Sequence, residues 1–229
     1  MDGYICAGLH FKFTFMFKTG SFEKEYTRNV LAGKKKVDTC LSLPADNFIF
    51  EKLLLKSNPN VKLFTCEKDK DVYLNGKQHL DSFVKPYHWN MEIEKVLTMK
   101  YATFDMINLD LCVATDKAME ILKLTKGKTT TDAVVSVTSM GRREGVGRPH
   151  KFYRQHTPMF WNDPLRIARM CNVAKSVGLY PSQIFRYINK ANGNTPMFTF
   201  IFTHKKQAKV EYQNLTPVKE SFSKLIKVA

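Results

Sequence analysis

The feature that most constrains the fold is a pair of short apolar segments separated by an amphipathic one. Residues 37–43 and 61–66 are apolar runs of strand length, and both end in polar residues. Between them, residues 48–55 carry apolar side chains at helical spacing, and an Asn-Pro-Asn sequence at 58–60 ends that helix. A strand, a helix and a second strand in this order form a βαβ unit with two parallel strands. The chain is therefore predicted to be an α/β protein built on a mostly parallel sheet.

Polar residues stand where these predicted strands end. Asp46 or Asn47 is expected to cap the helix, and Glu51 lies near its positive end. Glu67 directly follows the second strand. In nucleotide-binding βαβ units an acid at this place accepts hydrogen bonds from both ribose hydroxyls, which a neutral side chain does less well. The alternative is a surface glutamate at a strand end.

The charge of the chain points to a polyanionic partner. The 229 residues carry a formal net charge of +15, with a pI near 9.6, so nucleic acid is the leading expected partner. An anionic membrane surface is the competing explanation, but we find no run of about eighteen apolar residues and no Lys/Arg-rich amphipathic helix. The N-terminus lacks a signal-peptide pattern. The cysteines are odd in number and widely scattered, which is not the pattern of a disulfide framework: Cys6, Cys40, Cys66, Cys112 and Cys171. We therefore expect a cytoplasmic or otherwise intracellular protein without membrane association.

Further segments extend the pattern on both sides. Residues 9–17 alternate at period two and place phenylalanines on one face, which predicts an added N-terminal strand. Its apolar face is expected to pack on the domain's own sheet, or alternatively on a second copy of the chain in self-association. Residues 22–31 favour a short helix, so 1–36 is expected to be an extension and 37–229 the main domain. Further strands are expected at 104–112, 132–139, 198–203 and 210–213, the last one antiparallel, and further helices near 70–80 and from Thr115, Asp163 and Pro181.

Three loops of this predicted sheet resemble those of class I S-adenosylmethionine-dependent methyltransferases. They are Leu-Pro-Ala-Asp-Asn-Phe at 43–48, Phe-Thr-Cys-Glu-Lys-Asp at 64–69 and Phe-Asp-Met-Ile-Asn-Leu-Asp at 104–110. They follow or form the strands that would be one, two and four of that family, and the resemblance covers roughly residues 37–205. It implies a Rossmann-like methyltransferase fold with S-adenosylmethionine as cofactor. Together with the basic charge it makes methyl transfer to nucleic acid, RNA or DNA, the expected activity, with protein as the alternative target.

The resemblance also implies roles for individual residues. The acid after strand two, Glu67, would hold the cofactor ribose, with Lys68 beside it, and Leu111 would lie by the methyl group. Asn108 and Asp110 would orient the methyl acceptor. The segment beneath the methionine part of the cofactor would be Pro44, Ala45, Asp46 and Asn47.

Two departures from the family keep other interpretations open. The first loop of the family normally contains several glycines, which let the backbone approach the ligand, and the loop at 43–48 has none. The alternative function is a non-catalytic methyltransferase-like subunit that binds nucleic acid or serves assembly. The sequence Asn-Leu-Asp-Leu at 108–111 is also not the motif of amino-group methyltransferases, so the target atom is not assigned. For Asp110 the alternative is a helix cap or a salt-bridge partner.

A basic, glycine-containing segment follows the strand at 132–139. Residues 141–154 interleave Phe152 and Tyr153 with basic side chains. Guanidinium groups bind phosphates in bidentate fashion, and aromatic faces stack on unpaired bases. A solvated loop of incidental charge is the alternative. No metal-binding spacing is present and no metal is expected. The expected nucleic-acid contacts are Arg142, Arg143, Arg148, Lys151 and Arg154.

Overall fold

A computed structural model describes residues 22–34, 36–44, 47–83, 86–100, 103–141, 163–189 and 195–215. The strands are β1 (Thr39–Ser42), β2 (Lys62–Cys66), β3 (Tyr87–Trp89), β4 (Phe104–Ala114), β5 (Thr129–Met140), β6 (Tyr180–Asn189), β7 (Thr195–Thr203) and β8 (Glu211–Asn214). The helices are α1 (Phe22–Ala32), α2 (Ile49–Ser57), α3 (Lys70–Gly76), α4 (Ile93–Thr98), α5 (Thr115–Lys123) and α6 (Asp163–Ser176), with a 3-10 helix η1 (Lys77–Ser82).

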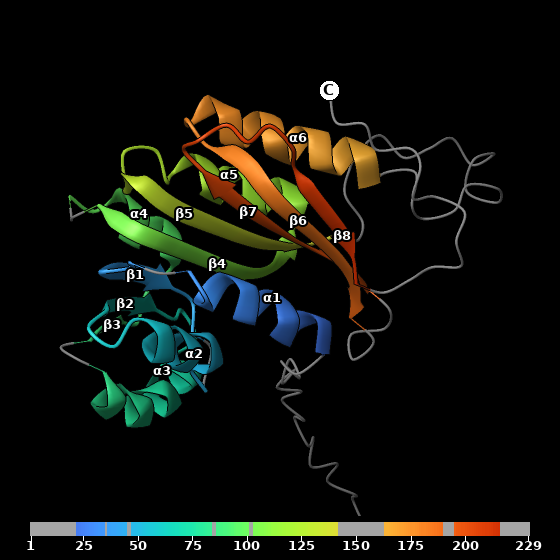
Figure 1. The fold of residues 1–229 in the computed structure, drawn as a ribbon. Helices are drawn as coiled ribbons and strands as arrows, with labels where there is room; N and C mark the ends of the chain where they lie inside the picture. The colour runs from blue at the N-terminus through green and yellow to red at the C-terminus, as the bar shows by residue number, and fades with distance from the viewer. Residues whose placement is uncertain are drawn as a thin grey trace, which may run out of the picture.

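The strands of the described residues form one eight-stranded sheet of order β3-β2-β1-β4-β5-β7-β6-β8 (Figure 1). Strands β3, β2, β1, β4 and β5 are parallel, and β7 is antiparallel to both of its neighbours. The expectation of a mostly parallel α/β sheet is confirmed.

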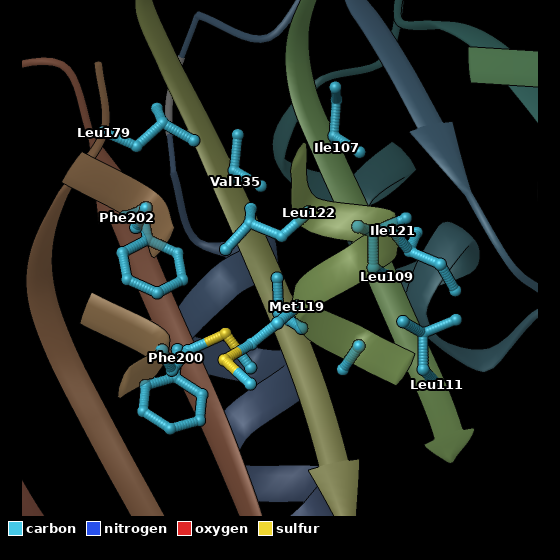
Figure 2. Close-up of a cluster of buried hydrophobic side chains, with 14 of the residues drawn as sticks. Ile107, Leu109, Leu111, Met119, Ile121, Leu122, Val135, Leu179, Phe200 and Phe202 are labelled. Atoms are coloured by element: carbon cyan, nitrogen blue, oxygen red, sulfur yellow. The ribbon is translucent and has the colours of Figure 1, made fainter. Parts of the chain in front are cut away.

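Helices cover both faces of this sheet, with α1, α2 and α3 on one face and α4, α5 and α6 on the other (Figure 1). Because side chains alternate along a strand, Ile107, Leu109 and Leu111 of β4 all point to the α5 face. There they pack with Met119 and Leu122 of α5 (Figure 2). Burying each such side chain contributes roughly 1.5–3 kcal/mol.

A second apolar core lies on the opposite face of the sheet. Leu31 of α1 and Phe50 and Leu54 of α2 pack there against Leu63 of β2 and Met106 of β4. Helix α1 falls within the predicted extension 1–36, yet it shares this core with the main sheet. The predicted strand at 9–17 lies outside the described residues and stays a prediction.

One predicted element is wrong, and another has a different neighbour. Residues from Pro181 form strand β6 instead of a helix, because the run from Ile184 to Ile188 pairs with β7 along its length. Strand β8 runs antiparallel to β7 as expected, but it hydrogen-bonds to β6, to which it is parallel. None of the helices within the described residues is long and apolar enough to cross a membrane.

Candidate functional site at the carboxyl ends of the strands

The parallel strands end along one edge of the sheet, and most of the predicted site residues that the structure describes lie on or next to this edge. The register pairs Ser42 of β1 with Asn108 of β4, and Cys66 of β2 with Trp89 of β3. The residues that follow β1 are therefore neighbours of the second half of β4, and those that follow β2 are neighbours of the residues that follow β3. Of the predicted cofactor residues, Ala45 and Asp46 lie outside the described residues, and those placed along this edge are Pro44, Asn47, Glu67 and Lys68.

Glu67 is fixed by hydrogen bonds at the end of β2. Its backbone N–H donates to the Trp89 carbonyl at 3.0 Å, and its Oε1 accepts from the Asp69 N–H at 2.9 Å. The Asn90 amide donates to the backbone carbonyls of Glu67 at 2.9 Å and Lys68 at 3.3 Å, so it joins the loops after β2 and β3. The Glu67 carboxylate, which has about four acceptor sites, thus keeps capacity for further donors.

An open cleft lies beside Glu67, between the loops after β2 and β3. Its volume is about 470 Å³, and acidic, basic and amide side chains line it together with one methionine. Glu67 is not among the lining residues, but it directly precedes one of them, Lys68. The lining residues are Lys68, Asp69, Asn90, Met91, Glu92 and Lys95.

The glycine-free loop after β1 makes its turn with a phenylalanine. Phe48 is the N-cap of α2 and has φ 53° and ψ 37°, a left-handed conformation that glycine adopts most readily. Its ring is fully buried against Phe83, His79 and His88, with ring centroids 5.6 to 5.9 Å apart. Phe48 therefore occupies the N-cap position and its side chain accepts no capping hydrogen bond, whereas Asp46, one of the two expected caps, lies outside the described residues. Burial of the ring compensates for the backbone strain at this position.

Asp110 lies under helix α1 in an ion-paired cluster. Its Oδ2 is 3.0 Å from the Lys24 ammonium and 3.2 Å from the Arg28 guanidinium, and these three side chains are 11 to 14% exposed. Burial alone would raise the pKa of Asp110, but the charges of Lys24 and Arg28 outweigh it and hold the pKa below its usual value. Asp110 is therefore ionised and anchors α1 through two ion pairs. A salt-bridge partner was one of the alternatives that the sequence left open for this residue.

Asn108 lies on the same face, two residues before Asp110, and is 5% exposed. Together with hydroxyl side chains of β5, β7 and α1 it lines a cavity of about 10 Å³, enough for one water molecule. The Leu111 side chain points to the opposite face and packs in the α5 core (Figure 2). The hydroxyl residues of the cavity are Thr27, Ser136, Thr138 and Thr199.

The basic segment after β5 begins at this edge. Ala114 of β4 pairs with Met140, the last residue of β5, and Gly141 follows at once. The nucleic-acid contacts predicted at Arg142, Arg143, Arg148, Lys151 and Arg154 lie outside the described residues. Within the described residues, no group of three His, Cys, Asp or Glu side chains could hold a metal ion.

Solved structures resemble this arrangement over most of the chain. The O-methyltransferase TomG from Streptomyces achromogenes, crystallised with S-adenosylmethionine, matches with a TM-score of 0.54 and 14% identity over 81% of this chain and 82% of its own. The plantazolicin methyltransferase BpumL, crystallised with S-adenosylhomocysteine, matches with a TM-score of 0.52 and 9% identity over 80% and 86%. The chain has the fold of class I methyltransferases.

Trm5b from Pyrococcus abyssi shares this methyltransferase fold, with a TM-score of 0.52 and 14% identity over 80% of this chain and 49% of its own. No protein-family model matches the sequence, and no curated protein matches it significantly. The identities are low, so the likeness establishes the methyltransferase fold and leaves substrate and activity to the geometry of the site.

The sequence analysis placed Glu51 near the start of a helix but did not predict that its side chain is buried. Glu51, in the first turn of α2, is 1% exposed, and neither carboxyl oxygen has a hydrogen-bond partner of ordinary geometry among the described residues. Burial raises the pKa of Glu51 to about 7, although the nearby Ser42 hydroxyl and the Arg28 charge oppose that rise. The helical spacing of α2 places Glu51 on the same side as Leu54, which is the signal that could have identified it as buried.

Glu51 should make stability depend on pH. Its folded-state pKa of about 7 exceeds the ordinary 4.5, so the native state binds the proton more tightly than the unfolded state. The contribution of Glu51 to stability is therefore greatest below pH 4.5 and falls as the pH rises towards 7. We expect wild type to lose up to about 3 kcal/mol over this interval relative to Glu51→Gln.

Urea denaturation at several pH values measures this difference. Glu120→Gln is the matched control, because the Glu120 side chain is 67% exposed and its neutralisation should leave the pH dependence unchanged. Identical pH profiles for wild type and Glu51→Gln would show that Glu51 stays ionised in the fold.

Proposed function

We propose that this chain is an S-adenosylmethionine-dependent methyltransferase that binds its cofactor at the carboxyl edge of the sheet. The cleft of about 470 Å³ at the ends of β2 and β3, next to Glu67, carries the proposal. Ligand clefts typically measure about 300 to 1,000 Å³, so this one has the size for a nucleoside. The crystal structure of TomG with S-adenosylmethionine supports the choice of cofactor, because TomG has the same fold.

The side chains of the cleft suit the nucleoside part of that cofactor. Glu67 keeps free acceptor sites for ribose hydroxyls, and Asn90 holds the loops after β2 and β3 in place. Pro44 and Asn47 lie at the end of β1, where the methionine part would extend, and Phe48 provides the tight turn there. When bound, the sulfonium supplies an activated methyl group, so the protein's own task is to position the two reactants.

Nucleic acid is the proposed methyl acceptor. The net charge of +15 favours a polyanionic substrate. The segment that carries Arg142, Arg143 and Arg148 leaves β5 at the same edge as Glu67, which supports contact with a substrate bound there. Asn108 and Asp110 would lie nearest the transferred methyl group, and they stay a prediction.

A second candidate function is a methyltransferase-like subunit that binds nucleic acid without catalysis. The placement of Asp110 favours it, because both cations beside Asp110 belong to α1, which covers that part of β4. An acid held in two ion pairs under a helix is poorly placed to meet a substrate.

Calorimetric titration with S-adenosylmethionine tests the proposed cofactor site. We expect the wild type to bind, and Glu67→Gln to weaken binding by roughly 1.5 to 3 kcal/mol, because an amide offers the ribose hydroxyls fewer acceptor sites and no charge. Asp71→Asn is the matched control: Asp71 is an exposed acid in the first turn of α3 and should not affect affinity.

The outcomes separate the two candidate functions. Equal affinity of wild type and Glu67→Gln would remove Glu67 from the site while leaving cofactor binding intact. A wild-type protein that fails to bind at millimolar ligand would overturn the catalytic proposal and leave the non-catalytic subunit.

A further inference from the structure

The loops that precede the parallel strands lie at the edge of the sheet opposite the proposed cofactor cleft. Each of these loops runs from the end of a helix to the start of a strand, as between α5 and β5. The turn after β7 joins them, because β7 is antiparallel and ends beside the start of β5, with Thr203 paired to Val134. We refer to this set of loops as the amino edge.

Lysines dominate the amino edge. They occur in the loops that lead from a helix into β1, β2, β4, β5 or β6, or in the last helical turn or first strand residue beside such a loop, and again after β7. Most of their side chains are exposed. The acids of these loops are far fewer: Asp38, Asp105, Asp132 and Glu211. The lysines are Lys34, Lys36, Lys56, Lys62, Lys100, Lys123, Lys126, Lys128, Lys175, Lys205, Lys206 and Lys209.

The fold brings together lysines that are far apart in the sequence. Lys205 lies 2.9 Å from Asp132 in an exposed ion pair, which is the main reason that the pKa of Asp132 is lowered. The charge of Lys36 also lowers the pKa of Asp132, so Lys36 and Lys205 approach the same carboxylate. His204 links the turn after β7 to its neighbours through Thr129 at 2.9 Å and the Gly178 carbonyl at 3.0 Å. Lysines of the loop before β1 and of the turn after β7 therefore lie close to the start of β5.

The acids of this surface neutralise little of its charge. Asp105 is held by the backbone N–H groups of Asp38 and Thr39 and by the hydroxyls of Thr39 and Thr130, so it binds its own loops together. Asp132 is paired with Lys205, and Glu211 accepts from Gln183. Within the described part of the chain, exposed lysines such as Lys206 and Lys209 form no ion pair with an acid.

We propose that the amino edge binds the phosphate backbone of nucleic acid, independently of base sequence. From β2 to β6 the edge crosses six neighbouring strands, which is about 24 Å at a strand spacing of about 4.8 Å. That length matches about seven base pairs of B-DNA at about 3.4 Å each. Lysines are mobile point charges that suit backbone contacts more than bidentate readout of bases.

Nucleic acid fits this surface better than a lipid bilayer does. A peripheral membrane site normally combines basic residues with apolar side chains that insert among the lipids. The exposed large apolar side chains of the described residues lie mostly elsewhere: Phe22, Tyr26 and Leu165 in the first half of α1 and α6, and Leu74 on α3. Near the amino edge the exposed aromatic is Tyr87, whose ring stacks on Phe64 at 4.7 Å.

The location separates this surface from the cofactor cleft. Glu67 and the cleft lie where β2 and β3 end, whereas Lys62 stands where β2 begins. Nucleic acid on the amino edge would therefore tether the protein without occupying the proposed active site. The inference depends on charge placement and topology, and it holds for either candidate function.

Fluorescence anisotropy with a labelled DNA duplex and with a labelled single-stranded RNA, each over a range of salt concentrations, tests the proposal. Two variants come from separate loops: Lys206→Gln/Lys209→Gln and Lys123→Gln/Lys126→Gln. Each should weaken binding and reduce the slope of log K against log salt, by up to about 1.8 for duplex at about 0.9 per phosphate contact. The control is Lys70→Gln/Lys77→Gln, which removes the same charge from exposed positions on α3 and η1.

A loss confined to the two test variants supports the amino edge, and comparison of the two probes shows whether duplex or single strand is preferred. Equal losses in the control would show that net charge alone drives binding and would overturn the proposal. Unchanged slopes in both test variants would place the contacts elsewhere. A wild type that binds vesicles of phosphatidylserine and phosphatidylcholine, but neither nucleic acid, would overturn it in favour of a membrane surface.

Discussion

Asp110→Asn is expected to lower the free energy of unfolding by about 3 to 5 kcal/mol, because it removes a buried negative charge that two mostly buried cations contact. The Lys24 ammonium and the Arg28 guanidinium both lie within 3.2 Å of Asp110 Oδ2, and all three side chains are at most 14% exposed. An amide of the same shape keeps the packing and removes only the charge. Urea denaturation at neutral pH measures the loss.

Acid should weaken the same interaction in the wild type. The folded-state pKa of Asp110 lies below the ordinary 3.8, so its stabilising contribution is complete above that value and is lost as the pH falls through the lower folded-state pKa. Asp132→Asn is the matched control, since its partner Lys205 is 79% exposed and the denaturation midpoint should not move. A variant Asp110→Asn as stable as the wild type would show that α1 is not anchored by this cluster.

The ion pairs of Asp110 could not be predicted from the pattern of strands and helices in the sequence. The sequence placed Asp110 correctly in the second half of β4, because the apolar run from Phe104 is long and regular. Its partners Lys24 and Arg28 lie more than eighty residues earlier. Their spacing of four residues marks one face of α1, but only the tertiary packing of α1 on β4 brings that face to Asp110.

The order of strands and helices was predictable where local patterns agree with the tertiary contacts. The segments 37–43 and 61–66 contain β1 and β2, because both are short, mostly buried parallel strands rich in apolar residues. The misassigned segment at Pro181 shows the limit. Proline commonly starts helices, but here Pro181 is the second residue of strand β6, and the register with β7 shifts between Pro181 and Gln183.

Within the candidate site, the positions of residues were easier to predict than their environments. Glu67 follows β2 as expected, since the end of an apolar run fixes the end of a strand. The cleft beside it depends on Asn90, which folds the loop after β3 towards Glu67, and the sequence contains no local signal for that contact. Glu51 was placed correctly in the first turn of α2, but its burial depends on how α1 and α2 pack together.

The glycine-free loop leads to a second strong expectation. Phe48→Ala should lower the free energy of unfolding by about 3 to 5 kcal/mol, because it removes a fully buried ring that contacts Phe83 and His88. Phe48→Gly removes the same ring, yet it should be about 1 kcal/mol more stable than Phe48→Ala, because glycine adopts a φ of 53° without the strain that a Cβ causes.

This order of alanine and glycine is the reverse of that expected inside a helix, and Leu54 provides the matched comparison. Leu54 is fully buried within α2, so Leu54→Gly should be less stable than Leu54→Ala by about 1 kcal/mol. Urea denaturation of the four variants gives both differences. A Phe48→Ala protein more stable than Phe48→Gly would contradict the left-handed turn. The expected order would mean that Phe48 adopts a left-handed backbone conformation at the proposed cofactor edge. Burial of its ring would then stabilise a turn that methyltransferases of this fold normally make with glycine.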